Sequence, residues 1–311
     1  MIESGMVSAT TISNQPSLFD DPTLNNLWVP PREVKPFKTQ LLKWIGNKQR
    51  FAHEIIGFFP TDFNTYYEPF LGSGAVLGTL APHKAVASDI LAPLVEIWQT
   101  LARDPAQLAR WYAERWTRYH EHGGKDGYEQ IKANFNAQPN GADLLFLSRS
   151  CYGGVVRFRK DGYMSTPCGV HAPISPAAFA ERARIWNERV RNTTFVHSDA
   201  LEMIEQTGRG DLVYCDPPYV DSQTILYGAQ AFKLEQLFDT IARAKTRGVK
   251  VVLSIDGTKR SGDKICDIPM PEGVFAREGL VNCGRSMLRR FQLAGETLED
   301  EVVNDRLLLT W

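Results

Sequence analysis

The tetrapeptide Asp216-Pro217-Pro218-Tyr219 follows directly on the apolar run 212–215. Such a run predicts a buried strand, and open α/β sheets bind ligands at the carboxyl ends of their strands. A carboxylate and a carbonyl held rigid by proline could together accept both N–H bonds of an exocyclic amine such as adenine N6. Tyr219 offers a face to an extruded base. The pattern indicates group transfer to a nucleobase amine by positioning and electrostatics, whereas turn formation alone does not explain the acid.

A glycine-rich turn, Glu68-Pro69-Phe70-Leu71-Gly72-Ser73-Gly74, lies ahead of the tetrapeptide. Glycines at a strand-to-helix turn let a ligand approach the backbone and leave helix amides exposed. Gly72, Gly74 and Gly78 miss the G-x-G-x-x-G spacing of dinucleotide sites, which argues against NAD. Asp89, at the end of the next predicted strand, could accept hydrogen bonds from ribose hydroxyls. The turn therefore predicts a site for another nucleoside.

Alternating strands and helices must position these two turns. The apolar patterns predict an α/β fold with a doubly wound, mostly parallel sheet. Helices are expected at 42–59 (with a loop at Gly46), after the glycine turn to about residue 80, and at 93–102. Strands are expected at 65–70, 85–88, 194–196, 212–214 and 249–255, with 306–311 as an edge strand.

Two segments depart from this rhythm. Residues 1–36 are polar and proline-punctuated, which predicts a flexible arm. Residues 101–191 are rich in Trp, Tyr, Arg and Gly, and we interpret them as a mainly helical insert with an irregular glycine-rich hairpin at 152–169. The catalytic domain would then comprise residues 37–100 and 192–311.

Charge is concentrated in this insert. The whole chain has a formal net charge of −1, but the segment 145–191 holds eight basic residues against three acidic ones. A local basic surface is what contact with nucleic acid phosphates requires. For the half of the cluster at 177–191, a solvated helix face is an equally good interpretation. The basic residues are Arg149, Arg157, Arg159, Lys160, Arg182, Arg184, Arg189 and Arg191.

The ordered motifs resemble the Dam-type, D12-class adenine-specific DNA methyltransferases. They are the segment 42–48 (Leu-Lys-Trp-Ile-Gly-Asn-Lys), the glycine turn, the insert and the Asp-Pro-Pro-Tyr tetrapeptide, and the similarity runs from about 40 to 311. The resemblance implies a Rossmann-like fold, transfer of methyl from S-adenosyl-L-methionine to N6 of a flipped-out adenine in double-stranded DNA, and catalytic residues at 216–219. The resemblance implies that Trp44, Lys48, Asp89 and Asp216 bind the cofactor. Further residues expected there are Phe70, Gly72 and Gly74 of the glycine turn and Asp199 at another strand end.

The segment Ser148–Phe158 is similar to the recognition hairpin of that family, so Arg157 is expected to read a guanine edge. Gly153 stands where the family usually has Asn, and Ser165-Thr166 replaces its Asn-Val. A GATC target is therefore not implied. Arg149 is expected either at a phosphate or in an internal ion pair, and Asp199 either near the adenine of the cofactor or as a helix cap. The residues expected at DNA are Arg149, Tyr152, Arg157, Arg159 and Lys160.

Some predictions concern partners and location. The peptide Gln15-Pro16-Ser17-Leu18-Phe19 is similar to sliding-clamp docking peptides, although a chance match or a local packing anchor explains five residues in a tail more readily. The five scattered cysteines lack metal-ligand spacing, so no structural metal is expected. The absence of long apolar runs and of a secretory signal indicates a cytoplasmic protein. Alternatives to adenine N6 are cytosine N4, an RNA base, or a non-catalytic DNA-binding role.

Overall fold

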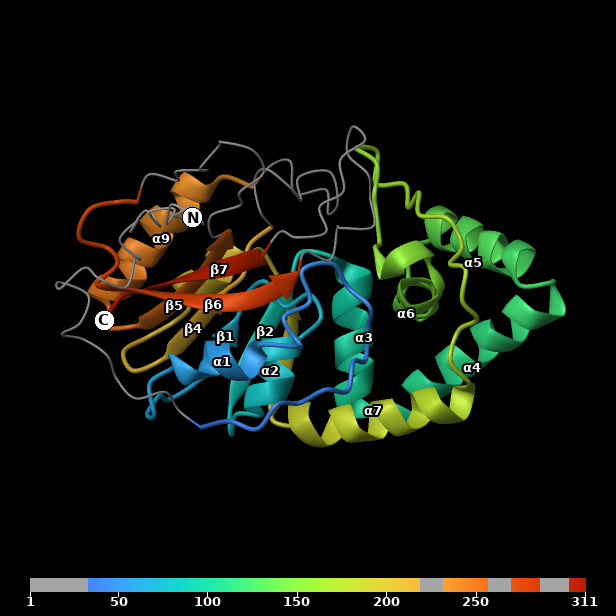
Figure 1. The fold of residues 1–311 in the computed structure, drawn as a ribbon, viewed down its shortest axis with the longest axis horizontal. Coiled ribbons are helices and arrows are strands. Elements are labelled where there is room, and N and C mark those ends of the chain that lie inside the picture. The colour runs from blue at the N-terminus through green and yellow to red at the C-terminus, as the bar shows by residue number, and fades with distance from the viewer. Residues whose placement is uncertain (1–32, 219–231, 257–269, 286–301) are drawn as a thin grey trace, which may run out of the picture. The chain divides into compact units, whose positions relative to one another are not determined.

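The structure, a computed structural model, describes residues 33–218, 232–256, 270–285 and 302–311. Seven strands form one sheet in the order β3-β2-β1-β4-β5-β7-β6 (Figure 1). The strands are β1 (Tyr66–Glu68), β2 (Ala85–Asp89), β3 (Thr193–His197), β4 (Leu212–Cys215), β5 (Lys250–Asp256), β6 (Arg277–Arg285) and β7 (Val302–Leu309).

The first five strands of this order run parallel, and β7 pairs antiparallel with both β5 and β6. The predicted α/β fold with a mostly parallel sheet is therefore confirmed. β1 lies between β2 and β4, because the chain runs outward from β1 to β3 and then returns to the other side of β1. This reversal creates a crevice at the carboxyl ends of β1 and β4, where open α/β sheets bind their ligands.

Helices cover both faces of the sheet. Leu212 and Tyr214 of β4 pack into one hydrophobic cluster and Val213 and Cys215 into another, as the two-residue period of a strand requires. One cluster contains α1 (Ala52–Gly57), α2 (Ala75–Leu80) and α3 (Ala92–Arg103), and the other contains α8 (Ala200–Glu205) and α9 (Leu234–Thr246). Burial on both faces explains why β4 reads as a continuous apolar run.

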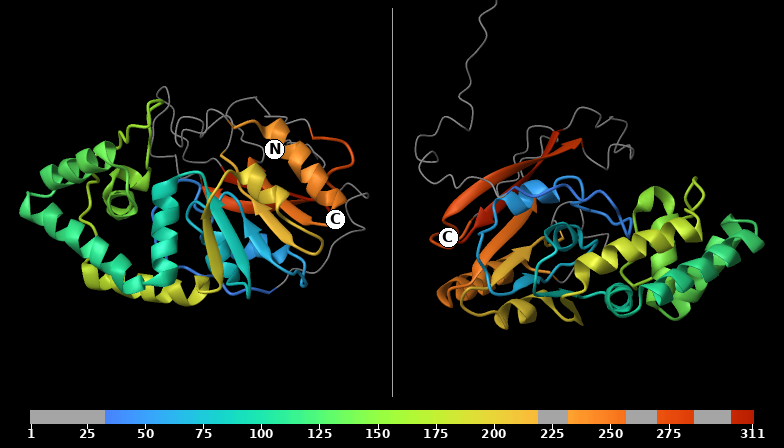
Figure 2. Two further views of the ribbon diagram at one scale, coloured as in Figure 1. Left: turned by 180° about the vertical axis from the view of Figure 1, so that it is seen from behind. Right: turned by 90° about the horizontal axis from the view of Figure 1, so that it is seen from below.

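The predicted insert is helical. It contains α4 (Pro105–Glu121), α5 (Lys125–Ala137), α6 (Gly141–Ser150) and α7 (Pro176–Val190). These helices lie beside the sheet, and α7 returns along α4 to α2 and α3 (Figures 1 and 2). Buried residues of the insert and of the sheet's α1–α3 face form one continuous cluster. The two parts therefore share a core, and the boundaries at 100/101 and 191/192 stay predictions.

Two of the predicted elements are wrong. The helix predicted over 42–59 with a loop at Gly46 forms only at Ala52–Gly57, whereas Gly46 does lie in a turn. Gly46 has a left-handed φ of 69°, and the Asn47 side chain accepts the backbone N–H of Gln49 at 2.8 Å, a local turn that competes with a helix. The strand predicted at 306–311 is not an edge strand, because β7 lies between β5 and β6. The sequence patterns did not indicate β6.

Some predictions fall outside the described residues. They include the peptide Gln15–Phe19, most of the arm at 1–36, and Tyr219. Within the residues that the structure describes, no helix has the length and apolarity needed to span a membrane.

Replacement of Gly78 by Ala tests the contact between α2 and α7. A Cβ at Gly78 would lie 2.4 Å from Cζ3 of Trp186, so a methyl group overpacks this contact. We expect Gly78→Ala to lower the free energy of unfolding by about 1–3 kcal/mol, although alanine is the better helix former. Gly208→Ala is the control, because the nearest atom to its Cβ would be 4.0 Å away. Urea denaturation measures both, and a Gly78→Ala protein as stable as wild type would contradict the packing argument.

Candidate functional site

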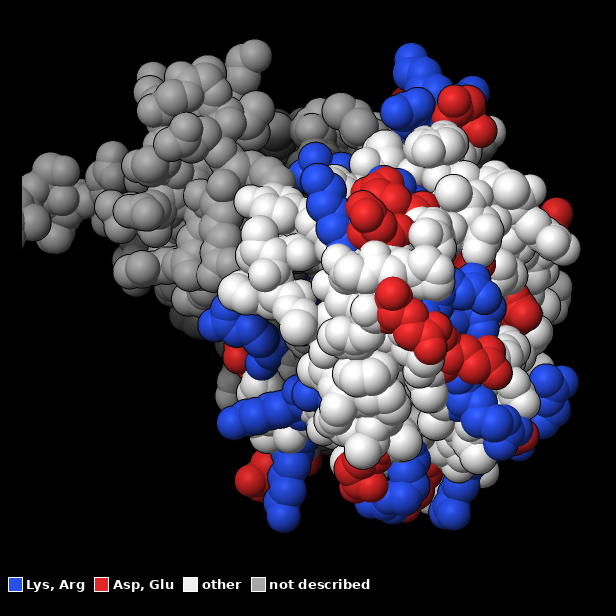
Figure 3. Space-filling view, turned by 90° about the vertical axis from the view of Figure 1, so that its right-hand side faces the viewer, with Lys and Arg blue, Asp and Glu red and all other residues white. Residues whose placement is uncertain are grey.

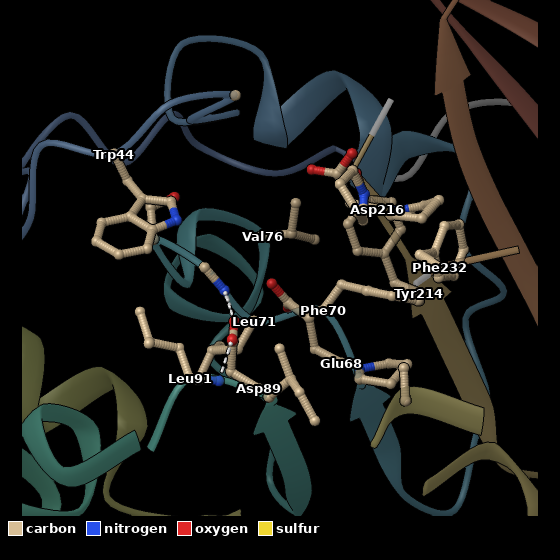
Figure 4. Close-up of a pocket in the computed structure, with 18 of the residues that line it drawn as sticks. Trp44, Glu68, Phe70, Leu71, Val76, Asp89, Leu91, Tyr214, Asp216 and Phe232 are labelled. Atoms are coloured by element: carbon tan, nitrogen blue, oxygen red, sulfur yellow. Dashed lines mark hydrogen bonds between the residues drawn. The ribbon is translucent and has the colours of Figure 1, made fainter. Parts of the chain in front are cut away.

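A pocket of about 350 Å³ opens at the carboxyl ends of β1, β2, β3 and β4. Its walls combine apolar side chains with carboxylates that lie near or at the ends of these strands (Figure 4). Phe70 and Phe232 meet edge to face at one side, with ring centroids 5.6 Å apart. The predicted residues that line it are Trp44, Lys48, Phe70, Gly72, Asp89, Asp199, Asp216, Pro217 and Pro218.

The glycine turn has the backbone that its sequence predicts. Gly72 and Gly74 have left-handed φ values of 48° and 61°. A Cβ at Gly74 would lie 2.9 Å from the ring of Trp98, whose Nε1 donates to the Gly72 carbonyl at 3.2 Å. A Cβ at Gly72 would lie 3.3 Å from the ring of Trp44. The absence of a side chain at Gly74 therefore lets Trp98 pack against the turn, and the absence of one at Gly72 keeps space between the backbone and Trp44.

Two acids beside the turn are held by backbone amides. Asp89 accepts the N–H of Gly72 at 3.0 Å through Oδ2 and that of Leu91 at 3.0 Å through Oδ1 (Figure 4). Burial raises the pKa of Asp89, and these hydrogen bonds oppose the rise. Asp199 caps α8 by accepting the N–H of Leu201 at 2.8 Å and also lines the pocket. The two roles considered for Asp199 are therefore compatible.

Lys48 has two protein partners that the sequence patterns did not predict. Its Nζ lies 3.1 Å from Oδ1 of Asp216 and 2.9 Å from Oδ2 of Asp305. The side chains of Lys48 and Asp305 are 6% and 4% exposed, so this ion pair is sheltered from solvent. The resemblance had implied a contact of Lys48 with the cofactor. In the structure the ammonium group connects β7 to the tetrapeptide and Lys48 also lines the pocket, so its contact with the cofactor stays a prediction.

Glu68 is a pocket residue to which the sequence patterns assigned no role. It ends β1, is 3% exposed, and accepts the hydroxyl of Tyr66 at 2.6 Å. Burial raises its pKa to about 8; the Tyr66 hydrogen bond opposes this shift, and the charge of Asp216 adds to it. An acid immediately after two tyrosines in a predicted buried strand was the only signal that could have drawn attention to it.

Comparison with known proteins shows which family the chain belongs to. A family model described as "D12 class N6 adenine-specific DNA methyltransferase" matches residues 44–273, a span that contains the glycine turn, the insert and the tetrapeptide. The chain belongs to this family. The characteristic activity is N6 methylation of adenine in DNA, which favours adenine over the alternatives of cytosine N4 and an RNA base, and catalysis over binding alone.

Individual relatives are similar at modest identity. The chain is 28% identical over 268 residues to the DNA N-6-adenine-methyltransferase of Escherichia phage P1, a match that covers 81% of this chain and 35% of the phage protein. It is 25% identical to the type II methyltransferase M1.LlaDCHI of Lactococcus lactis subsp. cremoris, over 71% of this chain and 81% of that one. It is 27% identical to a DNA adenine methylase of Vibrio cholerae, over 68% and 79%.

Arg149 of this methyltransferase is not a DNA contact, and that prediction is wrong. The residue is 6% exposed, and its Nη1 donates to the carbonyls of Gln40 and Leu41 at 3.2 and 2.7 Å. A buried guanidinium needs such acceptors, and the segment ahead of Trp44 supplies them. Neither predicted partner, a phosphate or an acid, accounts for these bonds.

The arginines of α7 also make contacts within the protein. Arg182 donates to the Gln40 carbonyl, Arg184 pairs with Glu181 and Glu188, and Arg189 donates to the carbonyls of Gly78 and Thr79. The face of the insert in Figure 3 intersperses basic and acidic side chains. The basic cluster at 177–191 is thus largely structural, which leaves the hairpin as the candidate nucleic-acid surface.

The glycine-rich hairpin forms as predicted. Isolated antiparallel β-bridges pair the backbone of Cys151 with that of Cys168 and the backbone of Phe158 with that of Met164, and both cysteines are free thiols. The Thr166 hydroxyl accepts the N–H of Arg157 at 2.8 Å and donates to the Val155 carbonyl at 2.9 Å, which gives this departure from the family pattern a structural role.

The rest of the hairpin presents side chains that could reach DNA. Gly153 has a φ of 65°, a conformation that Asn also tolerates, so its backbone remains compatible with the family while the amide side chain is lost. Tyr152, Arg159 and Lys160 are exposed, and Arg157 is partly exposed. The Arg159 guanidinium lies over the Tyr163 ring, 4.6 Å from its centroid.

The raised pKa of Glu68 predicts a dependence of stability on pH. A carboxyl whose pKa is about 8 in the folded protein, against an ordinary value of 4.5, binds more protons in the folded than in the unfolded state between these values. Its contribution to stability therefore falls as pH rises through that window. We expect Glu68→Gln, which keeps an oxygen for Tyr66, to be more stable than wild type by at least about 1 kcal/mol at pH 8. The advantage should diminish toward pH 5. Urea titrations at both pH values test this. The same change in unfolding free energy between pH 5 and pH 8 in the two proteins would contradict it.

Proposed function

We propose that this adenine-specific DNA methyltransferase takes its methyl group from S-adenosyl-L-methionine and transfers it to an adenine flipped out of duplex DNA. The observation that carries the proposal is the shared pocket of the glycine turn, Asp89 and Asp216. A nucleoside site and an acceptor for a base amine must lie together for direct transfer between them.

The pocket suits a cationic nucleoside. Asp89, Asp199 and Asp216 line it together with the apolar surfaces of Trp44 and Phe70, a combination that fits a sulfonium-bearing nucleoside. Bound S-adenosylmethionine would supply an electrophilic methyl group. In our proposal Asp89 accepts hydrogen bonds from the ribose hydroxyls, Trp44 packs along the cofactor, and the turn at Gly72 and Gly74 admits it close to the backbone.

The tetrapeptide would hold the target amine. A carboxylate has about four lone-pair sites, so Asp216 can accept from Lys48 and from an adenine N–H at the same time. The Pro217 carbonyl would accept the second N–H, and this arrangement draws the nitrogen lone pair out of the ring plane toward the methyl group. Asp216 then takes up the proton that the product amine sheds. Pro218 restricts the backbone, and Tyr219, which lies outside the described residues, would stack on the base.

The hairpin would bind DNA. We propose that Arg157 reads a guanine edge and that Arg159 and Lys160 contact phosphates, with Tyr152 beside them. Two further hypotheses stay predictions. They are docking of Gln15–Phe19 on the replication sliding clamp, and a cytoplasmic location.

Asp216→Ala tests the catalytic proposal. We expect methyl transfer to fall at least about 100-fold, because the amine loses a charged acceptor. The fold should survive, because Lys48 keeps Asp305 as its partner. Transfer of labelled methyl to an adenine-containing duplex measures the rate, and a thermal shift with S-adenosylmethionine reports on the pocket. Near-wild-type turnover would overturn the mechanism, and a wild-type protein without any thermal shift would contradict the proposed methyl donor.

Arg157→Ala tests the reading of sequence. We expect the variant to relax base choice at one position of the site by about 1–3 kcal/mol of discrimination. Arg159→Ala is the comparison, and it should weaken binding to all sequences and reduce the salt dependence. Methylation of a library of duplexes measures both. An unchanged recognition sequence in the Arg157→Ala protein would exclude the proposed base contact.

A further inference from the structure

We propose that Asp305 is a positioning residue for methyl transfer, which acts on Asp216 through the ammonium group of Lys48. The inference rests on the role proposed above for Asp216. It adds a residue from the C-terminal strand to the active site, although Asp305 does not line the pocket described above.

The three groups form a chain of contacts from three separate parts of the fold. Asp216 follows β4, Lys48 precedes α1, and Asp305 lies within β7. The Lys48 ammonium bridges the two carboxylates at 3.1 and 2.9 Å. Exposure decreases along the chain, from 19% for the side chain of Asp216 to 6% for Lys48 and 4% for Asp305. In this series of contacts Asp305 is therefore the most buried group, and Asp216 is the group at the pocket.

β7 provides a firm support for Asp305. Its Asp305 position pairs with Asp256 of β5 and with Val281 of β6, so backbone hydrogen bonding continues on both sides. Lys48 by contrast belongs to a short turn with no strand or helix of its own. A lysine side chain has several rotatable bonds, and it points to one place only where acceptors fix it. Asp305 supplies an acceptor on a strand that is paired on both sides.

The charges explain why a second carboxylate is useful. If Asp216 were the single partner of the Lys48 ammonium, the ion pair between them would be stronger. Asp216 would then be a weaker acceptor for the hydrogen bonds of an amine. Shared with Asp305, the same ammonium orients Asp216 while the group of three keeps a net negative charge. That charge favours the cation that develops as the methyl group reaches the nitrogen.

Stability alone is a poor explanation for Asp305. Burying an ion pair costs desolvation that its attraction often fails to recover, and apolar replacements are frequently as stable. Leu307, Leu308 and Leu309, which follow in the same strand, are buried apolar residues. An acid in such a strand, in contact with the lysine that holds a pocket carboxylate, is better explained by the orientation of Asp216.

Asp305→Asn and Asp305→Glu test the inference in the full-length protein. We expect Asp305→Asn to reduce the single-turnover rate of methyl transfer at least about 10-fold, while the KM values for S-adenosylmethionine and duplex DNA change less than about 3-fold. Asp305→Glu, which restores the charge, should recover part of the rate. The control is Asp211→Asn, another buried acid that accepts the backbone amides of Thr65 and Gly208 away from the pocket. It should lose stability but not rate.

A double-mutant cycle with Lys48→Met shows whether the effect passes through the lysine. In that background Asp305→Asn should have no further effect on rate, since the connecting ammonium is gone. This comparison also carries the test if Asp305→Asn alone does not fold. A wild-type rate for Asp305→Asn, or an equal rate loss with and without Lys48, would overturn the inference. If the Asp305 inference fails while Asp216→Ala is inactive in the same assay, only the role of Asp305 is refuted. An active Asp216→Ala protein would instead refute the proposed function itself.

Discussion

The carboxyl ends of β1, β2, β3 and β4 meet at one edge of the sheet, and every group of the site depends on this geometric constraint. A parallel strand delivers the residue after its last hydrogen bond to the same edge as its neighbours. Glu68, Asp89 and Asp216 reach a single pocket for this reason, although long segments of chain separate them. The crossing at β1 and β4 opens the space between the glycine turn and the tetrapeptide.

Burial in this pocket disfavours the charged form of a carboxyl group, and the acids that line the pocket have different partners. Asp89 accepts two backbone amides, which stabilise its charged form, and Asp199 caps a helix. Glu68 has no cation in its described contacts, and its raised pKa favours the protonated form near neutrality. Asp216 has a lysine shared with Asp305. One acid therefore keeps a partly exposed, partnered carboxylate at the pocket, which is the property that an acceptor for a base amine needs.

The insert and the site share one segment of chain. Arg149 of α6 and Arg182 of α7 donate to carbonyls at 40–41, and Trp186 donates to the carbonyl of Thr39. At the base of the hairpin, a Cβ on Gly154 would lie 2.8 Å from Cβ of Lys43. The same segment continues to Trp44 and Lys48. The insert, the base of the hairpin and two pocket residues are therefore connected through one short stretch of chain.

The sequence by itself determined the strand-ending tetrapeptide, the glycine turn, Asp89 and the helical insert, because each is written in a short stretch of residues. Apolar runs mark buried strands, and glycine at a tight turn marks a left-handed backbone, whatever the rest of the chain does. These local rules carried the fold class, and the ordered motifs carried the family.

Only the tertiary structure decided which charged groups meet. The sequence does not record that Lys48 lies between Asp216 and Asp305, that Arg149 is buried against 40–41, or that β7 is an inner strand. Charged side chains such as those of Asp305 and Arg149 are usually exposed, so the sequence alone does not mark either residue as buried. Whether a charge is solvated, or is buried and paired, depends on neighbours that come from distant segments of the chain, and only folding brings those neighbours together.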